Sequence, residues 1–196
     1  GIVQGSKFTD LREESAKFVA SQGFGGYAIG GLAVGEGHTQ MCETLDWTVP
    51  HLPLDRPCYV MGVGKPIDLV ECVARGVDMF DCVLPTRTGR HGQAWTWDGP
   101  INLKNAQWAE DLSPVAARVD CPASRDYSRA YLHHLFKSGE YLAPMILSWH
   151  NTAFFQALMA SLRAAIAEDR FEALRADLSS RWASTKSEPK EPQPDA

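Results

Sequence analysis

An alternation of short apolar runs with helical patterns constrains the fold of this chain most. Strand-like runs lie at residues 1–4, 26–29, 58–61 and 79–83. Helical patterns follow them over about 11–19 and 38–47, and a third starts at Pro66, which suits the first position of a helix. Strands that alternate with helices in this way are typical of βα units and a parallel sheet. The sequence therefore predicts an α/β fold, with four units that would make half of an eight-stranded barrel.

The second half of the chain has a different pattern. Residues 95–103 are expected to form a hairpin with a turn at Asp98-Gly99. Helices are expected further on, over about 127–136, 152–168 and 171–182. The residues from 184 onward are rich in Lys, Glu, Pro and Ser, and we expect a disordered tail there. The predicted division is a half barrel over 1–117, a helical sub-domain over 118–182 and a tail over 183–196.

The composition limits how the chain could bind nucleic acid. Its 196 residues are 44% hydrophobic, enough for a substantial core, and the net charge is −5. An acidic chain has no general attraction for RNA, so any RNA binding must come from a local patch. Such a patch is expected between residues 86 and 104, a segment that contains three cations, Arg87, Arg90 and Lys104, and a single acid, Asp98.

Cysteine usage indicates a reducing compartment. The five cysteines are odd in number and lack the spacing of a disulfide framework. Scattered free thiols are typical of the cytosol, so we expect a cytoplasmic protein. No apolar run approaches the ~20 residues of a membrane span, and no signal peptide is recognisable, so no membrane partner is expected. The chain starts at Gly1, inside a strand-like run, and we expect it to be truncated there.

Asp81 is the candidate nucleophile. It lies in what we expect to be a buried strand, followed by a loop, punctuated by Pro85 and Gly89, that carries Arg87 and Arg90. A carboxylate at the carboxyl end of a strand, with cations close behind it, suits a nucleophile beside an anion-binding loop. The alternative is that Asp81 caps the next element and both arginines are solvated.

The other strand ends are also polar or glycine-rich. They carry Gln4, Gly30-Gly31 and the segment from Gly62 to Lys65. In βα barrels the functional residues gather at the carboxyl ends of the strands. The Gln4 amide can both donate to and accept from the edge of a heterocycle, and paired glycines let backbone groups approach a flat ligand. The alternative is that each of these residues only forms a turn.

Four motifs of the chain resemble the bacterial tRNA-guanine transglycosylases. The motifs are 1–5, 26–36, 62–68 and 79–90, in the family's order and spacing, and the resemblance extends to about Leu178. It implies the C-terminal half of a TIM barrel with a zinc-binding helical insertion. It also implies the family's activity, which exchanges the guanine at the wobble position of a tRNA anticodon for a 7-deazaguanine precursor of queuosine.

The resemblance assigns roles by position. Asp81 matches the nucleophile that attacks the ribose anomeric carbon, forms a covalent intermediate and is displaced by the incoming base. The base-binding positions are Gln4, Gly30, Gly31, Leu32 and Met61. The RNA-binding positions are Gly62, Val63, Gly64, Lys65, Pro66, Ile67 and Asp68, and then Thr86, Arg87, Thr88, Gly89 and Arg90. Glu36 is expected to support the pocket wall.

The zinc positions of the family are only partly kept. The resemblance places Val119, Cys121 and Ser124 at three cysteine positions and His150 at the fourth, a histidine. Structural zinc takes four nitrogen or sulfur ligands, and only Cys121 and His150 qualify. Tight zinc binding is therefore not expected. His133, on the predicted helix, is expected to pack or to face solvent, as is His134.

Two functions remain open. The first is a fragment of a tRNA-guanine transglycosylase that acts on wobble-guanine tRNA, works as a homodimer and needs the barrel's other half for its acid/base carboxylates. The second is a non-catalytic tRNA-binding accessory paralogue, which the loss of two zinc ligands favours. Retention of Asp81 and of the arginines after it favours the enzyme. A βα-barrel glycosidase is disfavoured because no second carboxylate lies at a strand end.

The remaining candidates are assigned structural roles. We expect packing rather than RNA stacking for the tryptophans Trp95, Trp97 and Trp108. Cys82 follows Asp81 on the expected strand, so alternation would turn it to the opposite face of the sheet.

Overall fold

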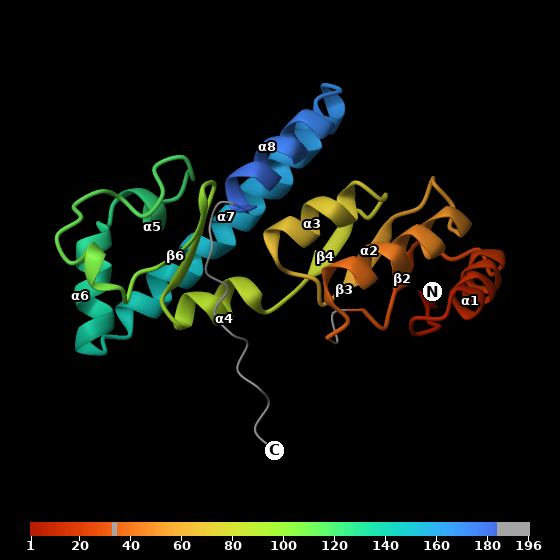
Figure 1. The fold of residues 1–196 in the computed structure, drawn as a ribbon, viewed down its shortest axis with the longest axis horizontal. Helices are drawn as coiled ribbons and strands as arrows, with labels where there is room; N and C mark the ends of the chain where they lie inside the picture. Colours follow the sequence, from red (N-terminus) through yellow and green to blue (C-terminus); the bar gives the residue numbers. More distant parts are fainter. Residues whose placement is uncertain (33–34, 184–196) are drawn as a thin grey trace, which may run out of the picture.

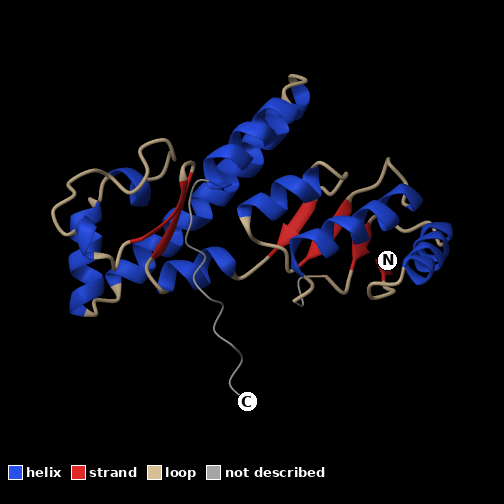
Figure 2. Ribbon diagram, viewed as in Figure 1, coloured by secondary structure: helices blue, strands red, loops and turns tan. Residues whose placement is uncertain are grey.

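The computed structural model describes residues 1–32 and 35–183, so the expected tail lies almost entirely outside the described residues. A parallel sheet with α1 to α3 occupies one end of the molecule, the short helices α5 and α6 occupy the other, and α4 and α7 lie between them (Figure 1). Helices make up most of the secondary structure, around one four-stranded sheet and one hairpin (Figure 2).

Four parallel strands form the sheet, in the order β1-β2-β3-β4. The strands are β1 (Ile2–Val3), β2 (Tyr27–Ile29), β3 (Cys58–Met61) and β4 (Met79–Asp81). Each strand leads into a helix: α1 (Thr9–Ser21), α2 (Gly37–Thr48), α3 (Pro66–Val73) and α4 (Leu84–Arg90). In the register, Val3 pairs with Ile29, and Met61 with Asp81. The α/β class and the parallel βα units are confirmed.

The strand that carries Asp81 is not the buried strand we predicted. β4 ends at Asp81 rather than at Val83, and Met79 is 53% exposed. Phe80 is only partly buried and Asp81 is exposed. The reason is topological, because β4 is an outer strand of the described sheet and pairs with β3 alone.

The segment after β4 was predicted to be a loop and is the helix α4 (Leu84–Arg90). Pro85 lies in its first turn, where a missing N–H costs nothing. The Arg87 N–H donates to the Val83 carbonyl at 2.8 Å, and the Thr88 hydroxyl donates to the Leu84 carbonyl at 2.7 Å. The sequence prediction treated Pro85 and Gly89 as residues that break helices. In the structure Pro85 lies in the first turn of α4, and Gly89 allows α4 to pack closely against α7.

The predicted hairpin is present, with its turn one residue early. β5 (Gln93–Thr96) pairs antiparallel with β6 (Gly99–Asn102), and Thr96 opposite Gly99 leaves Trp97-Asp98 as the turn. The Thr96 hydroxyl donates to the Gly99 carbonyl at 2.7 Å and accepts from the Asp98 N–H at 3.2 Å. Gly99 has a φ of +111°, which only glycine adopts readily, so it closes the turn from within β6.

The C-terminal part is helical. It contains α5 (Pro122–Arg125), α6 (Arg129–Ser138), α7 (Leu142–Ala167) and α8 (Phe171–Ala183), and single 3-10 turns lie at Val49–His51 and Ala106–Trp108. Ser128 caps α6 by accepting from the Tyr131 N–H at 3.1 Å. α7 starts at Leu142 rather than near Thr152, because Ala143, Ile146, Leu147 and His150 form one buried helical face ahead of the predicted start.

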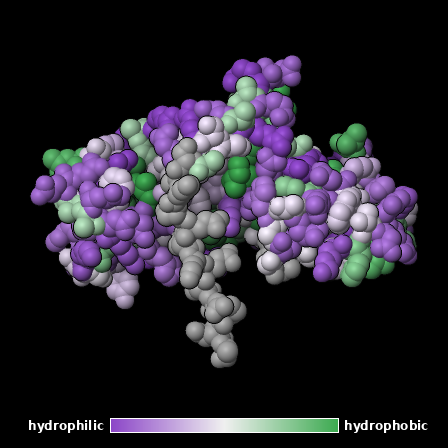
Figure 3. Space-filling model, in the orientation of Figure 1, coloured by the Kyte–Doolittle hydropathy of each residue, from purple (hydrophilic) through white to green (hydrophobic). Residues whose placement is uncertain are grey.

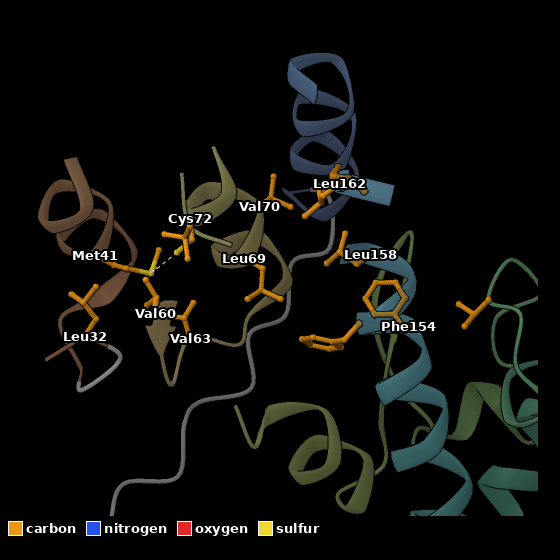
Figure 4. Close-up of a cluster of buried hydrophobic side chains, with 14 of the residues drawn as sticks. Leu32, Met41, Val60, Val63, Leu69, Val70, Cys72, Phe154, Leu158 and Leu162 are labelled. Atoms are coloured by element: carbon orange, nitrogen blue, oxygen red, sulfur yellow. Dashed lines mark hydrogen bonds between the residues drawn. The ribbon is translucent and has the colours of Figure 1, made fainter. Parts of the chain in front are cut away.

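One hydrophobic core joins the two ends of the molecule. Leu69 and Val70 on α3 lie toward Leu158 and Leu162 on α7, and the cluster continues to Val60 on the inner strand β3 (Figure 4). The Glu71 carboxylate accepts two hydrogen bonds from the Arg175 guanidinium, at 2.8 and 2.7 Å, and thereby ties α3 to α8. The predicted boundary near residue 117 stays a prediction.

The visible surface is mostly hydrophilic, with small and separated hydrophobic patches (Figure 3). Among residues 1–32 and 35–183, no helix combines the length and the apolarity needed to cross a bilayer.

Candidate active site

Asp81 stands at the carboxyl end of β4 with its charge stabilised. Its Oδ1 accepts hydrogen bonds from the Tyr59 hydroxyl at 2.5 Å and from the Gly62 N–H at 3.1 Å. The Tyr59 hydrogen bond, followed by that from Gly62, holds the pKa of Asp81 below its usual value. The carboxyl is therefore ionised at neutral pH. Both of these hydrogen bonds fall on Oδ1.

Tyr59 was missed by the sequence analysis. It lies on β3 directly beside Met79, and Met61, two residues later, lies beside Asp81. Because side chains alternate along a strand, Tyr59, Met61, Met79 and Asp81 share one face of the sheet. The hydrogen bond to Asp81 also raises the pKa of the Tyr59 phenol, so Tyr59 remains a donor at neutral pH. A strand alignment of residues 58–61 against 79–81 would have found it.

Gln4 lies over the Gly30-Gly31 turn after β2. A methyl group placed on Gly30 would come within 2.4 Å of the Gln4 side-chain nitrogen Nε2, and one on Gly31 within 3.2 Å of its Oε1. Gly31 has a φ of +70°, a conformation that favours glycine. The structure thus brings together three predicted base-binding residues that come from two neighbouring strands. Leu32 next to them is buried in the core at 6% exposure, whereas Met61 is 37% exposed beside Asp81.

Arg12 on α1 fixes the backbone of this turn and was also missed. Its side chain is fully buried, and its Nη1 donates to the Gly30 carbonyl at 2.8 Å. Its Nε donates to the Ser6 carbonyl at 2.7 Å, and its Nη2 reaches the Gly31 carbonyl at 3.5 Å. Burial lowers the pKa of Arg12, and the nearby Glu36 carboxylate opposes that shift. Arg12 falls on the same helical face as the buried Ala16 and Val19, which was the available signal.

The predicted RNA-binding segment 62–68 connects β3 to α3. Gly62, with a φ of +76°, directs its N–H to Asp81. Val63, Gly64 and Pro66 are buried, whereas Lys65 is exposed. The Asp68 carboxylate lies 2.6 Å from the His38 ring nitrogen Nδ1 on α2. Only part of this segment is therefore open to a partner.

Cys82 packs against the segment 62–68 at Gly64. A methyl group on Gly64 would lie 2.4 Å from the Cys82 Sγ, so Gly64 allows the two segments to approach closely. Cys82 follows β4 rather than continuing it, and it is partly buried.

The segment from Thr86 to Arg90 has one exposed and one packed face. Thr86, Arg87 and Arg90 are exposed. On the packed side, the Thr88 hydroxyl oxygen accepts from the Trp95 indole N–H at 3.1 Å, and a methyl group on Gly89 would lie 2.8 Å from the Ser148 backbone nitrogen. The exposed arginines are thus carried by a helix that is fixed against α7 and the hairpin.

Two hollows of the surface lie away from Asp81. One is lined by Arg90 at the end of α4, by Phe136 and by residues 139–141 and 144. The other lies beside Tyr127 and Tyr131, whose rings are stacked. Asp81 lines neither of these hollows.

The tryptophans pack as expected. Trp95 contacts Phe155 edge to face, and Trp97 contacts Phe154 in the same way. Trp108 carries the Arg129 guanidinium over its ring at 4.9 Å. The three tryptophan rings therefore pack against other side chains of this chain.

The residues at the four predicted zinc positions are all buried. Val119 has no donor atom, and the Ser124 hydroxyl lies 2.8 Å from the His150 Nδ1 atom. In the part of the chain that the structure describes, no three His, Cys, Asp or Glu side chains are grouped as metal ligands. His133 lies 2.8 Å from the Leu103 carbonyl and is buried, whereas His134 is exposed.

Comparison with known proteins gives a consistent result. The family described as "Queuine tRNA-ribosyltransferase" matches residues 1–184. A queuine tRNA-ribosyltransferase of Caulobacter vibrioides is 70% identical over 181 residues, which are 92% of this chain and 49% of that protein. Proteins of the same name from Novosphingobium aromaticivorans and Zymomonas mobilis are 61% and 54% identical, over 90% and 93% of this chain and 47% of each relative. The chain spans about half the length of the curated relatives it matches.

Proposed function

The chain belongs to the queuine tRNA-ribosyltransferase family, and from this membership we propose that it carries the nucleophile half of a tRNA-guanine transglycosylase. The whole protein would exchange a guanine of tRNA for a 7-deazaguanine precursor of queuosine at the wobble position. The observation that carries the proposal is the exposed Asp81 carboxylate, whose pKa is lowered by Tyr59 and Gly62. The four parallel βα units fit the C-terminal half of a TIM barrel, with Asp81 at its catalytic end.

The proposed reaction has two displacements. In the first, Asp81 Oδ2 forms a bond to the ribose C1′, the bond from C1′ to guanine N9 breaks, and its electron pair leaves with the base, which takes up a proton. In the second, the deprotonated N9 of the incoming 7-deazaguanine forms the new bond to C1′ and Oδ2 leaves. Two inversions retain the configuration at C1′. Hydrogen bonds from Tyr59 and Gly62 to Oδ1 orient the carboxylate and favour its return to the ionised form.

The base would lie against the Gly30-Gly31 turn. There the Gln4 amide can donate to and accept from the edge of a purine-like ring. Leu32 and Met61 would line the same pocket, and Arg12 would hold the turn in place. A tRNA nucleotide has to leave the stacked anticodon loop to reach this position.

Three cations are placed to hold the RNA. Lys65 after β3 and Arg87 and Arg90 on α4 are exposed on segments that adjoin Asp81. Guanidinium groups bind phosphates and base edges with paired hydrogen bonds. We assign segments 62–68 and 86–90 to RNA contact, and we place the enzyme in the cytoplasm as a homodimer that uses residues 127–135 and α7.

The altered zinc positions favour a second candidate. A non-catalytic accessory paralogue would bind tRNA without exchanging its base, and Val119 and Ser124 depart from the family's ligand pattern. Asp81 with its Tyr59 and Gly62 partners stands against this alternative.

The test uses the full-length protein, a wobble-guanine tRNA and labelled guanine. We expect incorporation of label by the unaltered protein and none by Asp81→Asn. Asp55→Asn, at an exposed carboxylate that pairs with the neighbouring Arg56, is the matched control and should keep full incorporation. Label incorporation by Asp81→Asn would remove Asp81 from the nucleophile role. A folded protein that binds the tRNA but exchanges nothing would instead establish the accessory function.

A further inference from the structure

Four buried residues occupy the positions that correspond to the family's metal ligands, and two of them, Ser124 and His150, are joined by a hydrogen bond. Val119, Cys121, Ser124 and His150 are at most 3% exposed. Val119 and Cys121 precede α5, Ser124 lies within it, and His150 projects from α7. Ser124 and His150 are in direct contact across the two segments, the backbone of Ser124 is hydrogen-bonded to Cys121 and that of Cys121 to Val119, and only Cys121 and His150 could serve as strong zinc ligands.

The contacts of His150 fix its tautomer. Nε2 lies 2.9 Å from the Trp95 carbonyl oxygen, which can only accept, so Nε2 carries the proton. Nδ1 then has a lone pair and accepts from the Ser124 hydroxyl at 2.8 Å. Both ring nitrogens are satisfied in the neutral state. The lone pair of Nδ1, which a metal would otherwise take, is held by Ser124.

The same contacts reach the arginine-bearing helix. Asn151, next to His150 on α7, accepts from the Trp95 N–H and donates to the Pro85 carbonyl, both at 2.9 Å. The backbone of Trp95 is therefore held on both sides by consecutive residues of α7, and its indole donates to Thr88 on α4. The chain of contacts runs from α5 through α7 and β5 to α4.

We propose that the C-terminal sub-domain of this protein keeps its fold without zinc. A latch, formed by the hydrogen bonds of His150 with Ser124 and with the Trp95 carbonyl and packed by Val119, joins α5 to α7 and β5. The hydroxyl of Ser124 replaces the metal as the group that joins α5 to α7, and the methyl groups of Val119 fill the space of a further ligand. The latch also fixes the hairpin on which α4 packs. This proposal concerns the fold of the sub-domain and does not depend on the transglycosylase reaction.

The first test measures zinc in the full-length protein after purification and dialysis, together with thermal unfolding in the presence and absence of a zinc chelator. We expect far less than one zinc ion per chain and an unfolding midpoint that the chelator does not change. Stoichiometric zinc that survives dialysis, or a midpoint lowered by the chelator, would overturn the proposal.

The second test separates the latch from general packing. Ser124→Ala should lower the unfolding midpoint by about 4 °C, because it leaves Nδ1 buried without a donor. Ser138→Ala, at the exposed end of α6, should leave the midpoint unchanged. Nitrogen NMR of His150 should show Nε2 protonated and Nδ1 as a hydrogen-bonded acceptor, and added zinc should not shift either signal. A zinc-induced shift at Nδ1 would contradict the latch.

The third test restores the metal. A Val119→Cys, Ser124→Cys double variant adds two thiolates to Cys121 and His150, so it should bind about one zinc ion per chain and become sensitive to the chelator. Ser124→Cys alone should bind zinc more weakly, with three donors. A folded double variant that binds no zinc would show that the four positions do not converge, and the latch could not then stand in the place of a metal.

Discussion

Tyr59 donates a hydrogen bond to Asp81 across two neighbouring parallel strands, and Gly62, three residues after Tyr59, donates a second to the same oxygen. One short stretch of chain around the end of β3 thus supplies both groups that stabilise the carboxylate on β4. The contact makes Tyr59 a positioning residue for the proposed nucleophile. If Tyr59 has this role, its hydroxyl should affect the pKa of Asp81, which a purely structural role would not require.

Tyr59→Phe should raise the pKa of Asp81 toward its usual value. The folded-state pKa of Asp81 is depressed, with the Tyr59 hydrogen bond as the largest cause, so removing the hydroxyl favours the protonated form. Carbon NMR titration of the Asp81 carboxyl would measure the change, and the acid limb of the exchange rate should move to higher pH. Tyr141→Phe, on a tyrosine that is 85% exposed, is the control. An unchanged Asp81 titration in Tyr59→Phe would contradict the assignment.

Arg12→Met should destabilise the protein and disorder the predicted base site. It would leave the Ser6 and Gly30 carbonyls without their donor inside the fold, at a cost of about 2 to 4 kcal/mol. Denaturant unfolding measures this loss, and binding of guanine to the full-length protein measures the effect on the site. Arg56→Met removes an exposed guanidinium and should change neither quantity. Weaker guanine binding by a still-folded Arg12→Lys would separate positioning of the turn from general stability.

The sequence could predict the parts of this fold that follow from periodicity. The parallel βα units depend on apolar runs separated by helical patterns, and those signals are local. Proline and glycine residues were a less decisive signal, because Pro85 and Gly89 are compatible both with a loop and with a helix. Pro85 is acceptable in the first turn of a helix, and Gly89 is explained only by the backbone of Ser148, which lies far away in sequence.

The candidate site was predictable to the same extent. The positions of Asp81 and Gln4 at strand ends could be seen in the sequence and are confirmed, whereas their roles stay predictions. Tyr59 and Arg12 act through contacts made across elements, to Asp81 and to the Gly30 carbonyl. Such contacts depend on strand register and helix orientation, which one sequence does not specify. The Ser124–His150 pair is of the same kind, since its hydrogen bond joins two helices.

Gly89→Ala should destabilise the protein although alanine is the better helix former. The added methyl group would lie 2.8 Å from the Ser148 backbone nitrogen, so α4 and α7 would have to move apart. Overpacking of this kind costs about 1 to 3 kcal/mol, more than the ~1 kcal/mol that alanine gains in helix propensity. Gly25→Ala is the control, because a methyl group there meets no atom within 4 Å. Urea unfolding of both variants decides, and equal or greater stability of Gly89→Ala would mean that α4 does not pack closely on α7.

Stability should fall as the pH drops from about 6.5 toward 4 because His150 is buried in its neutral form. Burial lowers its folded-state pKa from 6.5 to about 4, and the hydrogen bond to the Trp95 carbonyl only partly opposes this. Above about pH 7.5 the ring is neutral in both states and contributes almost no pH dependence. Between the two pKa values the unfolded chain takes up a proton that the folded chain does not, so stability is lost.

At pH 5 the loss from this one group should be about 2 kcal/mol relative to pH 7.5. Urea unfolding across this range measures it. His150→Gln should be less stable at neutral pH but should lose less on acidification, whereas His134→Gln, which alters an exposed ring, should keep the full pH dependence. The difference between the two variants isolates the His150 contribution from the titration of carboxylates. If both variants lost stability equally on acidification, His150 would not be the buried neutral group on which the latch depends.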